Sequence, residues 1–242
     1  MNYNKSINNK NSKMKQKLLK ISKLTSSNFG EPLDYFLNFI LKINSLKGSV
    51  IIDFSDCQNV SPLIIGGIVC VVNAKKEEGV KIEYILPINN YFNNIYFPNG
   101  LDYNIEEFEK ILKPFQYSSF IPLIKFPVSI SENNKLEKLI SEINIILKMQ
   151  LKLKGDYLKV VQYLITEFIQ NIIEHSDSKF GILISRYYAQ NNYIDLCFAD
   201  SGKGFLKSYL DTEKYHPKND EEALNYAVFG KSTKDIPESR GF

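Results

Sequence analysis

The stretch Thr166–Ser178, TEFIQNIIEHSDS, decides how this chain is interpreted. Its apolar residues recur at helical spacing, yet three different polar side chains, Glu167, Asn171 and His175, recur every fourth residue. At about 100° per residue these three drift from the water edge of the helix onto its apolar arc, whereas Gln170 falls on the opposite, solvated side. Polar groups at the edge of a core need hydrogen-bond partners. We therefore expect a cleft beside this helix.

Two strands and a glycine-rich turn are predicted after the helix. Residues 180–205 read as a pair of strands joined at Gln190–Asn192. Three apolar side chains of the second strand share one face by alternation: Ile194, Leu196 and Phe198. Asp200 is the next residue on that face, where a carboxylate is costly unless it accepts hydrogen bonds. The glycines of the following turn, Ser201–Gly204, permit positive φ and close approach of a ligand.

The order Glu-x-x-x-Asn-x-x-x-His, hairpin, Asp-x-Gly-x-Gly resembles the GHKL ATPases, which include gyrase, the heat-shock chaperone, histidine kinases and mismatch-repair ATPases. The resemblance covers about residues 157–242 and rests on the order and spacing, because each motif alone is common. It implies an α+β fold whose C-terminal part is an α/β sandwich of the Bergerat type. It also implies that ATP and Mg²⁺ bind there.

The resemblance assigns roles to the matching residues. Asp200 would accept the exocyclic amine of adenine, and a carboxylate, which only accepts, favours adenine over guanine at that edge. Gly202 and Gly204 would let the backbone pass beside the nucleotide. Asn171 would ligate Mg²⁺ through its carboxamide oxygen, while phosphates and water complete the octahedron.

The catalytic role falls to Glu167, which would orient or deprotonate the attacking nucleophile from one helical turn before Asn171. For His175 two roles stay open. It either binds near the phosphates or forms hydrogen bonds within the fold.

Residues 219–242 resemble the family's ATP lid. Asp220 is predicted to cap a helix that ends at Gly230. A cation and two hydroxyls follow and would bind nucleotide: Lys231, Ser232 and Thr233. In the family a Gly-x-Gly then cradles phosphates at a helix N-terminus. Here the sequence ends one residue after Gly241, before the second glycine of such a motif. We therefore expect the domain to be truncated within the lid.

The N-terminal half predicts a second α/β unit over residues 21–90. A helical pattern over Leu33–Ile43 precedes a strand at Gly48–Cys57. Ser61 and Pro62 mark a helix start, which ends near Gly79 before a further strand. Strand, buried helix and strand predict a βαβ unit.

This unit resembles a STAS domain, the anti-sigma antagonist fold, over about residues 30–90. The resemblance rests on the strand–turn–helix pattern. The family's phosphoacceptor serine lies at the start of this helix, where the chain has Val60, Ser61 and Pro62. Ser61 is a candidate phosphoacceptor, and a plain helix cap is the favoured interpretation.

Three further segments complete the predicted organisation. Residues 1–20 are rich in Asn and Lys and predict a disordered basic tail. Residues 91–130 predict a connector with a short helix near Ile105–Leu112. Residues 131–242 predict the truncated ATP-binding domain, which opens with a helix over Glu132–Leu153.

Composition excludes several classes of function. Thirty basic and 27 acidic residues give a net charge of +3, with both signs mixed, which disfavours nucleic acid as a partner. No secretory signal or membrane-length apolar segment is predicted. The three cysteines lie far apart in apolar runs, so we expect buried thiols in a cytoplasmic protein and no zinc site.

Three functions compete. The first is an ATP-binding regulatory protein of the anti-sigma serine kinase type, acting by partner switching on a STAS-type or other regulatory protein. The second is a non-enzymatic module whose interactions are gated by ATP. The third, a histidine kinase fragment, is disfavoured, because the two histidines, His175 and His216, lie in the predicted nucleotide helix and lid. A homodimer is compatible with each.

Overall fold

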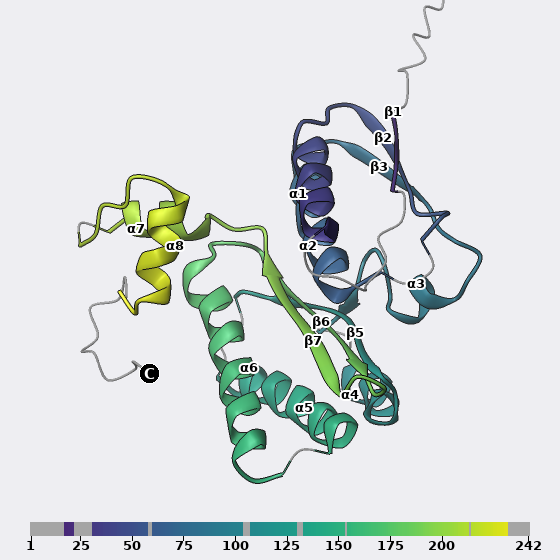
Figure 1. The fold of residues 1–242 in the computed structure, drawn as a ribbon, viewed down its shortest axis with the longest axis vertical. Helices are drawn as coiled ribbons and strands as arrows, with labels where there is room; N and C mark the ends of the chain where they lie inside the picture. Colours follow the sequence, from purple (N-terminus) through teal and green to yellow (C-terminus); the bar gives the residue numbers. More distant parts are fainter. Residues whose placement is uncertain are drawn as a thin grey trace, which may run out of the picture.

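The computed structural model describes residues 17–21, 31–57, 60–103, 107–129, 133–152, 154–212 and 214–231. It is an α+β structure with two β-sheets and helices between and around them, which confirms the predicted class (Figure 1). Within these residues, no helix combines the length and apolar character needed to cross a bilayer.

The first sheet is parallel, and its strand order is β1-β2-β3. Its strands are β1 (Lys17–Lys20), β2 (Ser49–Asp53) and β3 (Lys81–Ile85). The connections are helical: α1 (Glu31–Asn44) and α2 (Pro62–Glu77). The predicted strand–helix–strand unit is therefore present, with β2 and β3 parallel neighbours.

The first strand corrects the predicted tail. Lys17–Lys20 pairs in register with β2, and the next residue, Ile21, is fully buried. Leu19 packs against the core, whereas Leu18 stays 55% exposed. The composition of this segment predicts a solvated chain, but its backbone hydrogen bonds to β2 hold it in the sheet. The other residues of the predicted tail, 1–16, lie outside the described ranges.

Helix α2 begins and ends where the sequence predicts. Ser61 occupies the N-cap with an extended backbone and Pro62 follows, although the Ser61 hydroxyl makes no capping hydrogen bond. At the other end Gly79 has φ of +87°, and the N–H groups of Gly79 and the next residue bond to the carbonyls of Lys76 and Lys75 at 3.0 Å each. This is a Schellman motif, which requires positive φ at the glycine.

The second sheet is mixed, with the order β4-β5-β6-β7. Its strands are β4 (Leu101–Asp102), β5 (Phe120–Pro127), β6 (Phe180–Tyr188) and β7 (Tyr193–Asp200). The β4–β5 pair is parallel, and the two pairs that follow are antiparallel. The predicted hairpin of two strands after the nucleotide helix is thus confirmed as β6–β7.

The remaining helices fall in two groups. Short segments lead into the second sheet: α3 (Tyr91–Asn94), α4 (Phe108–Leu112) and a 3₁₀ turn, η1 (Lys113–Tyr117). The larger group belongs to the C-terminal part: α5 (Asn133–Leu151), α6 (Gly155–His175), α7 (Gly204–Leu210) and α8 (Asp220–Val228). Helices α5 and α6 bury their apolar faces against one side of the second sheet.

Strand β5 corrects the predicted connector. Residues 91–130 contain two strands of the second sheet, and β5 lies between β4 and β6. Two prolines obscured it, because proline cannot donate to a strand ladder. In the structure Pro127 ends the strand, and Pro122 falls where the register to β6 shifts between Ile121 and Ile124. A bulge of this kind accommodates a missing N–H.

Helix α2 packs on both sheets. It lies between the first sheet and the face of the second sheet opposite α5 and α6 (Figure 1). Gly66 allows the approach to the second sheet and Gly67 allows the packing of α1, because neither glycine has room for a side chain. A Cβ on Gly66 would lie 2.5 Å from Sγ of Cys197 in β7, and one on Gly67 would lie 2.4 Å from Cζ of Phe36 in α1. The two sheets therefore share a continuous core through α2.

The three cysteines, Cys57, Cys70 and Cys197, are buried thiols, as the apolar setting of each predicts. Burial raises the pKa of the Cys197 thiol to about 12. These side chains therefore act as small apolar groups in the core and not as reactive thiolates.

Candidate functional site

Helix α6 presents the three predicted polar residues along one edge. Its apolar face buries Ile165, Ile169 and Ile172 in the core of the second sheet. Glu167 and His175 are half-buried and Asn171 is exposed. The polar stripe therefore borders the core without entering it.

Two neighbours on this helix differ from the helical-wheel expectation. Gln170 is half-buried and lines a groove beside α5, although the wheel places it toward solvent. Phe168 belongs to the predicted apolar arc, yet its side chain is 48% exposed and stacks on Phe198 of β7, with the ring centroids 5.2 Å apart. Helix α5 lies beside the flank of α6 that carries Gln170 and partly covers that side chain, whereas the flank that carries Phe168 stays partly exposed.

Asp200 ends β7 on the face predicted for it. Ile194, Leu196 and Phe198 pack against the α5–α6 core, and Asp200 continues that row at the strand end. Its Oδ1 accepts a hydrogen bond of 2.8 Å from the N–H of Gly202. The carboxylate is thus held by its own turn, and among the described residues its second oxygen makes no hydrogen bond.

The Asp-x-Gly-x-Gly turn is attached to the end of α6. The N–H of Lys203 donates to the carbonyl oxygen of Ser176 at 2.8 Å. A Cβ on Gly202 would lie 1.9 Å from that same oxygen, so a glycine is required for the turn to pack there. Gly204 has φ of +71° and open space around its Cβ position. This contact brings Asp200 and the C-terminal end of the α6 stripe to one end of the second sheet.

Lys203 of this turn forms ion pairs with two aspartates. Its Nζ lies 3.0 Å from a carboxylate oxygen of Asp177 and 3.0 Å from one of Asp211. These hydrogen bonds raise the pKa of Lys203 above its ordinary value. The pKa of His175 is lowered, first by burial and then by the positive charge of Lys203. His175 is therefore a neutral imidazole at pH 7, able to accept as well as donate.

The predicted lid begins with a helix whose cap differs by one residue. Asn219, and not Asp220, is the N-cap of α8, and its side chain accepts from the N–H of Glu222 at 2.9 Å. Asn and Asp cap helices about equally well, so the sequence alone does not decide between these two neighbours. In the structure the backbone is extended at Asn219, as an N-cap requires.

Lys231 follows α8 and points into a cluster of three tyrosines. Its Nζ lies 3.5 Å from the ring centroid of Tyr226 and 5.6 Å from that of Tyr215. Its carbonyl oxygen accepts a hydrogen bond of 2.5 Å from the hydroxyl of Tyr209. The other predicted lid residues lie outside the described ranges: Ser232, Thr233 and Gly241.

A half-buried polar cluster on the opposite face of the second sheet was not predicted. Arg186 of β6 lies opposite Asp195 of β7, and its guanidinium lies 5.0 Å from the ring centroid of Tyr188 and 5.7 Å from that of Tyr91. Burial is the main cause of the raised pKa values of Asp195 and Tyr188. Alternation in β6 puts Arg186 on an otherwise apolar face, and this break in the pattern is the signal that could have revealed the cluster.

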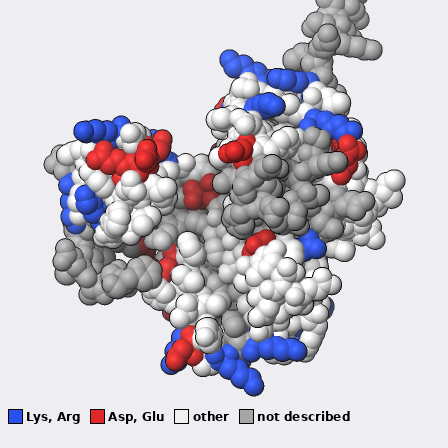
Figure 2. Space-filling model, in the orientation of Figure 1, with Lys and Arg blue, Asp and Glu red and all other residues white. Residues whose placement is uncertain are grey.

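The surface between α7–α8 and the α1–α2 side is hollowed, and a patch of acidic side-chain atoms is visible in that hollow (Figure 2). Within the described ranges, no group of three or more His, Cys, Asp or Glu side chains could hold a metal ion. A metal bound here through Asn171 would take most of its ligands from elsewhere.

No protein-family model matches the chain, and no curated protein or solved structure shows significant similarity to it.

Proposed function

We propose that this chain is an ATP- and Mg²⁺-binding regulatory protein of the anti-sigma serine kinase type, with the nucleotide between α6, the Asp200 turn and the lid. One observation carries the proposal. The turn after β7 is attached to the end of α6 through Ser176 and has no room for a side chain at Gly202. A carboxylate with an open acceptor and the C-terminal end of the polar stripe on α6 therefore lie at one end of the sheet.

The chemistry of these groups fits the nucleotide parts. Asp200 offers only acceptors, as recognition of the adenine amine requires. Asn171 is exposed on α6 and carries a hard oxygen ligand, so phosphates and water would complete a Mg²⁺ shell around it. Glu167, one turn earlier, would act in proton transfer.

The arrangement of elements supports the finer fold assignment as part of the same proposal. Two helices on one face of a mixed sheet, followed by a hairpin and an Asp-Gly turn, fit a Bergerat-type sandwich. A parallel three-stranded sheet with α1 and α2 between its strands fits a STAS-like unit. Because α2 packs on the second sheet, a STAS-type partner protein would have to bind elsewhere on this chain.

A second candidate, the non-enzymatic ATP-gated module, is favoured by one observation. Lys231, the lid cation, rests over Tyr226 and Tyr215. A lysine that exchanges between a tyrosine cluster and a phosphate could change the lid surface without any turnover.

Nucleotide titration tests the binding proposal. We expect the wild type to prefer Mg-ATP over Mg-GTP and Asp200→Asn to weaken ATP binding by about 10- to 100-fold, the scale of a charge-assisted hydrogen bond. Asp156→Asn makes the same change at an exposed position near the start of α6 and should have no effect. Equal affinities of the wild type for the two nucleotides would refute the assignment.

Two further variants separate an enzyme from a gated binder. Asn171→Ala should weaken Mg²⁺-dependent binding under either candidate function. If the protein is an enzyme, Glu167→Ala should retain binding but lose about 10² to 10⁴ in turnover, the range of a general base. If it is a gated binder, the wild type releases negligible phosphate and Glu167→Ala changes little.

A further inference from the structure

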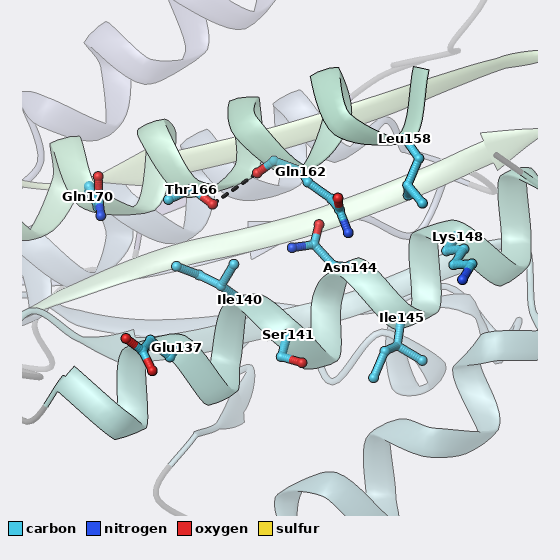
Figure 3. Close-up of a pocket in the computed structure, with 10 residues that line it drawn as sticks. All are labelled: Glu137, Ile140, Ser141, Asn144, Ile145, Lys148, Leu158, Gln162, Thr166 and Gln170. Atoms are coloured by element: carbon cyan, nitrogen blue, oxygen red, sulfur yellow. Dashed lines mark hydrogen bonds between the residues drawn. The ribbon is translucent and has the colours of Figure 1, made fainter. Parts of the chain in front are cut away.

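A groove separates α5 from α6 on their solvent side (Figure 3). It is about 650 Å³ in volume and is distinct from the candidate nucleotide site. Asn144 of α5 and Gln162 of α6 point toward one another across its middle (Figure 3). The Oδ1 atom of Asn144 is buried and has no hydrogen-bond partner among the described residues. The groove is thus lined by both polar and apolar side chains, as protein–protein interfaces are.

The wall formed by α5 has a symmetrical chemical pattern. Six of its residues line the groove, in the order acidic, apolar, polar, polar, apolar, basic: Glu137, Ile140, Ser141, Asn144, Ile145 and Lys148. The separations in sequence between successive members form the same series when read from either end of the helix. Reversing the helix therefore exchanges the two polar residues, the two isoleucines and the two opposite charges.

We infer that this surface binds a second copy of the same chain, with the two α5 helices antiparallel about a twofold axis. Such an axis makes an interface self-complementary, so that residue i of one copy meets residue j of the other and the reverse. Centred between Ser141 and Asn144, it places Glu137 opposite Lys148 of the second copy. Ile140 then meets Ile145, and Ser141 meets the amide of Asn144.

The charges on α5 favour a second copy over an unrelated partner. Neither Glu137 nor Lys148 forms an ion pair with a described residue, whereas the neighbouring Lys138 pairs with Glu109. A partner that matched both ends of the groove would need a basic and an acidic group at the separation found on α5 itself. The same side of the helix also leaves Ile145 41% exposed, which a contact with Ile140 of a second copy would cover.

Charge reversal tests this pairing directly. Glu137→Lys and Lys148→Glu each turn two facing ion pairs into like-charge contacts, so each variant alone should raise the dimer dissociation constant at least about tenfold. In a mixture of the two variants every facing pair is opposite in charge again, and dimers should form between them. The double variant should likewise dimerise with itself.

The measurement is sedimentation velocity of the full chain over a range of concentrations, with differently labelled variants in the mixture. Lys110→Glu on the exposed side of α4 is the matched control and should leave the dimer unchanged. Because the altered side chains are exposed, thermal melting should confirm that each variant is folded. The wild type remaining monomeric at every concentration would overturn the inference. So would a dimer that is insensitive to both reversals, or single variants that weaken it without recovery on mixing.

Discussion

Gly66 offers a direct test of the shared core. A Cβ at this position would lie 2.5 Å from Sγ of Cys197, a separation that folded proteins do not tolerate. The other near atoms, Cβ of Cys197 and Cγ2 of Ile184, would lie at 3.7 and 3.8 Å, which are ordinary contacts. One sulfur atom therefore accounts for the steric conflict.

The magnitude follows from two opposing effects. Gly66→Ala should gain about 1 kcal/mol from helix propensity, because Gly66 lies inside α2. Overpacking against the sulfur should cost about 1–3 kcal/mol and should therefore cancel or exceed that gain. Cys197→Ala alone removes one buried atom and should cost about 1 kcal/mol. In the double variant the new methyl fills the space that the sulfur leaves, so we expect a favourable coupling energy of about 1–3 kcal/mol.

Urea unfolding followed by circular dichroism measures all four members of this double-mutant cycle. Gly67→Ala is the matched control, since its Cβ would meet the ring of Phe36 in α1 and not Cys197. It should be destabilised, and Cys197→Ala should not rescue it. If the effects of Gly66→Ala and Cys197→Ala are additive within about 0.5 kcal/mol, α2 does not pack on β7 as described.

Three other changes have predictable outcomes. Gly202→Ala should lower the melting temperature and abolish nucleotide binding, because a Cβ would lie 1.9 Å from the carbonyl oxygen of Ser176 and the turn must move. His175 has a folded-state pKa below its ordinary value of 6.5, so the unfolded chain takes up a proton first. Stability should therefore fall as the pH drops below 6.5, and His175→Gln should remove that part of the pH dependence in unfolding curves. Gln150→Leu should cost about 1–3 kcal/mol in unfolding free energy, since its buried amide donates to two backbone carbonyls, at 2.7 and 2.9 Å.

The predicted helices and most strands agree with the structure, because long periodic segments and capping residues carry strong local signals. The start of α2 at Ser61–Pro62 and its stop at Gly79 are examples. Strands β1 and β5 were missed for a common reason. Each is defined by pairing with a distant strand, while its own residues, two lysines in one and two prolines in the other, argue locally against a strand.

The candidate site was predictable in part. Alternation along β7 placed Asp200 on the face toward α6, and the structure has it there. The contact between Gly202 and Ser176 is a tertiary feature, and no local pattern indicates how closely a turn approaches the end of a helix. Binding of the nucleotide and the metal stays a prediction that nucleotide titration tests, and the catalytic role of Glu167 stays a prediction that the turnover of Glu167→Ala tests.

The position of α2 between the two sheets has a consequence for the order of synthesis. Gly66 and its neighbours leave the ribosome with α1 and β2, but the strands that cover their other side, β6 and β7, come much later in the chain. The nascent protein therefore exposes one apolar side of a finished helix until residue 200 has emerged. Such a surface is a natural binding site for chaperones and a point at which stalled or truncated chains would aggregate.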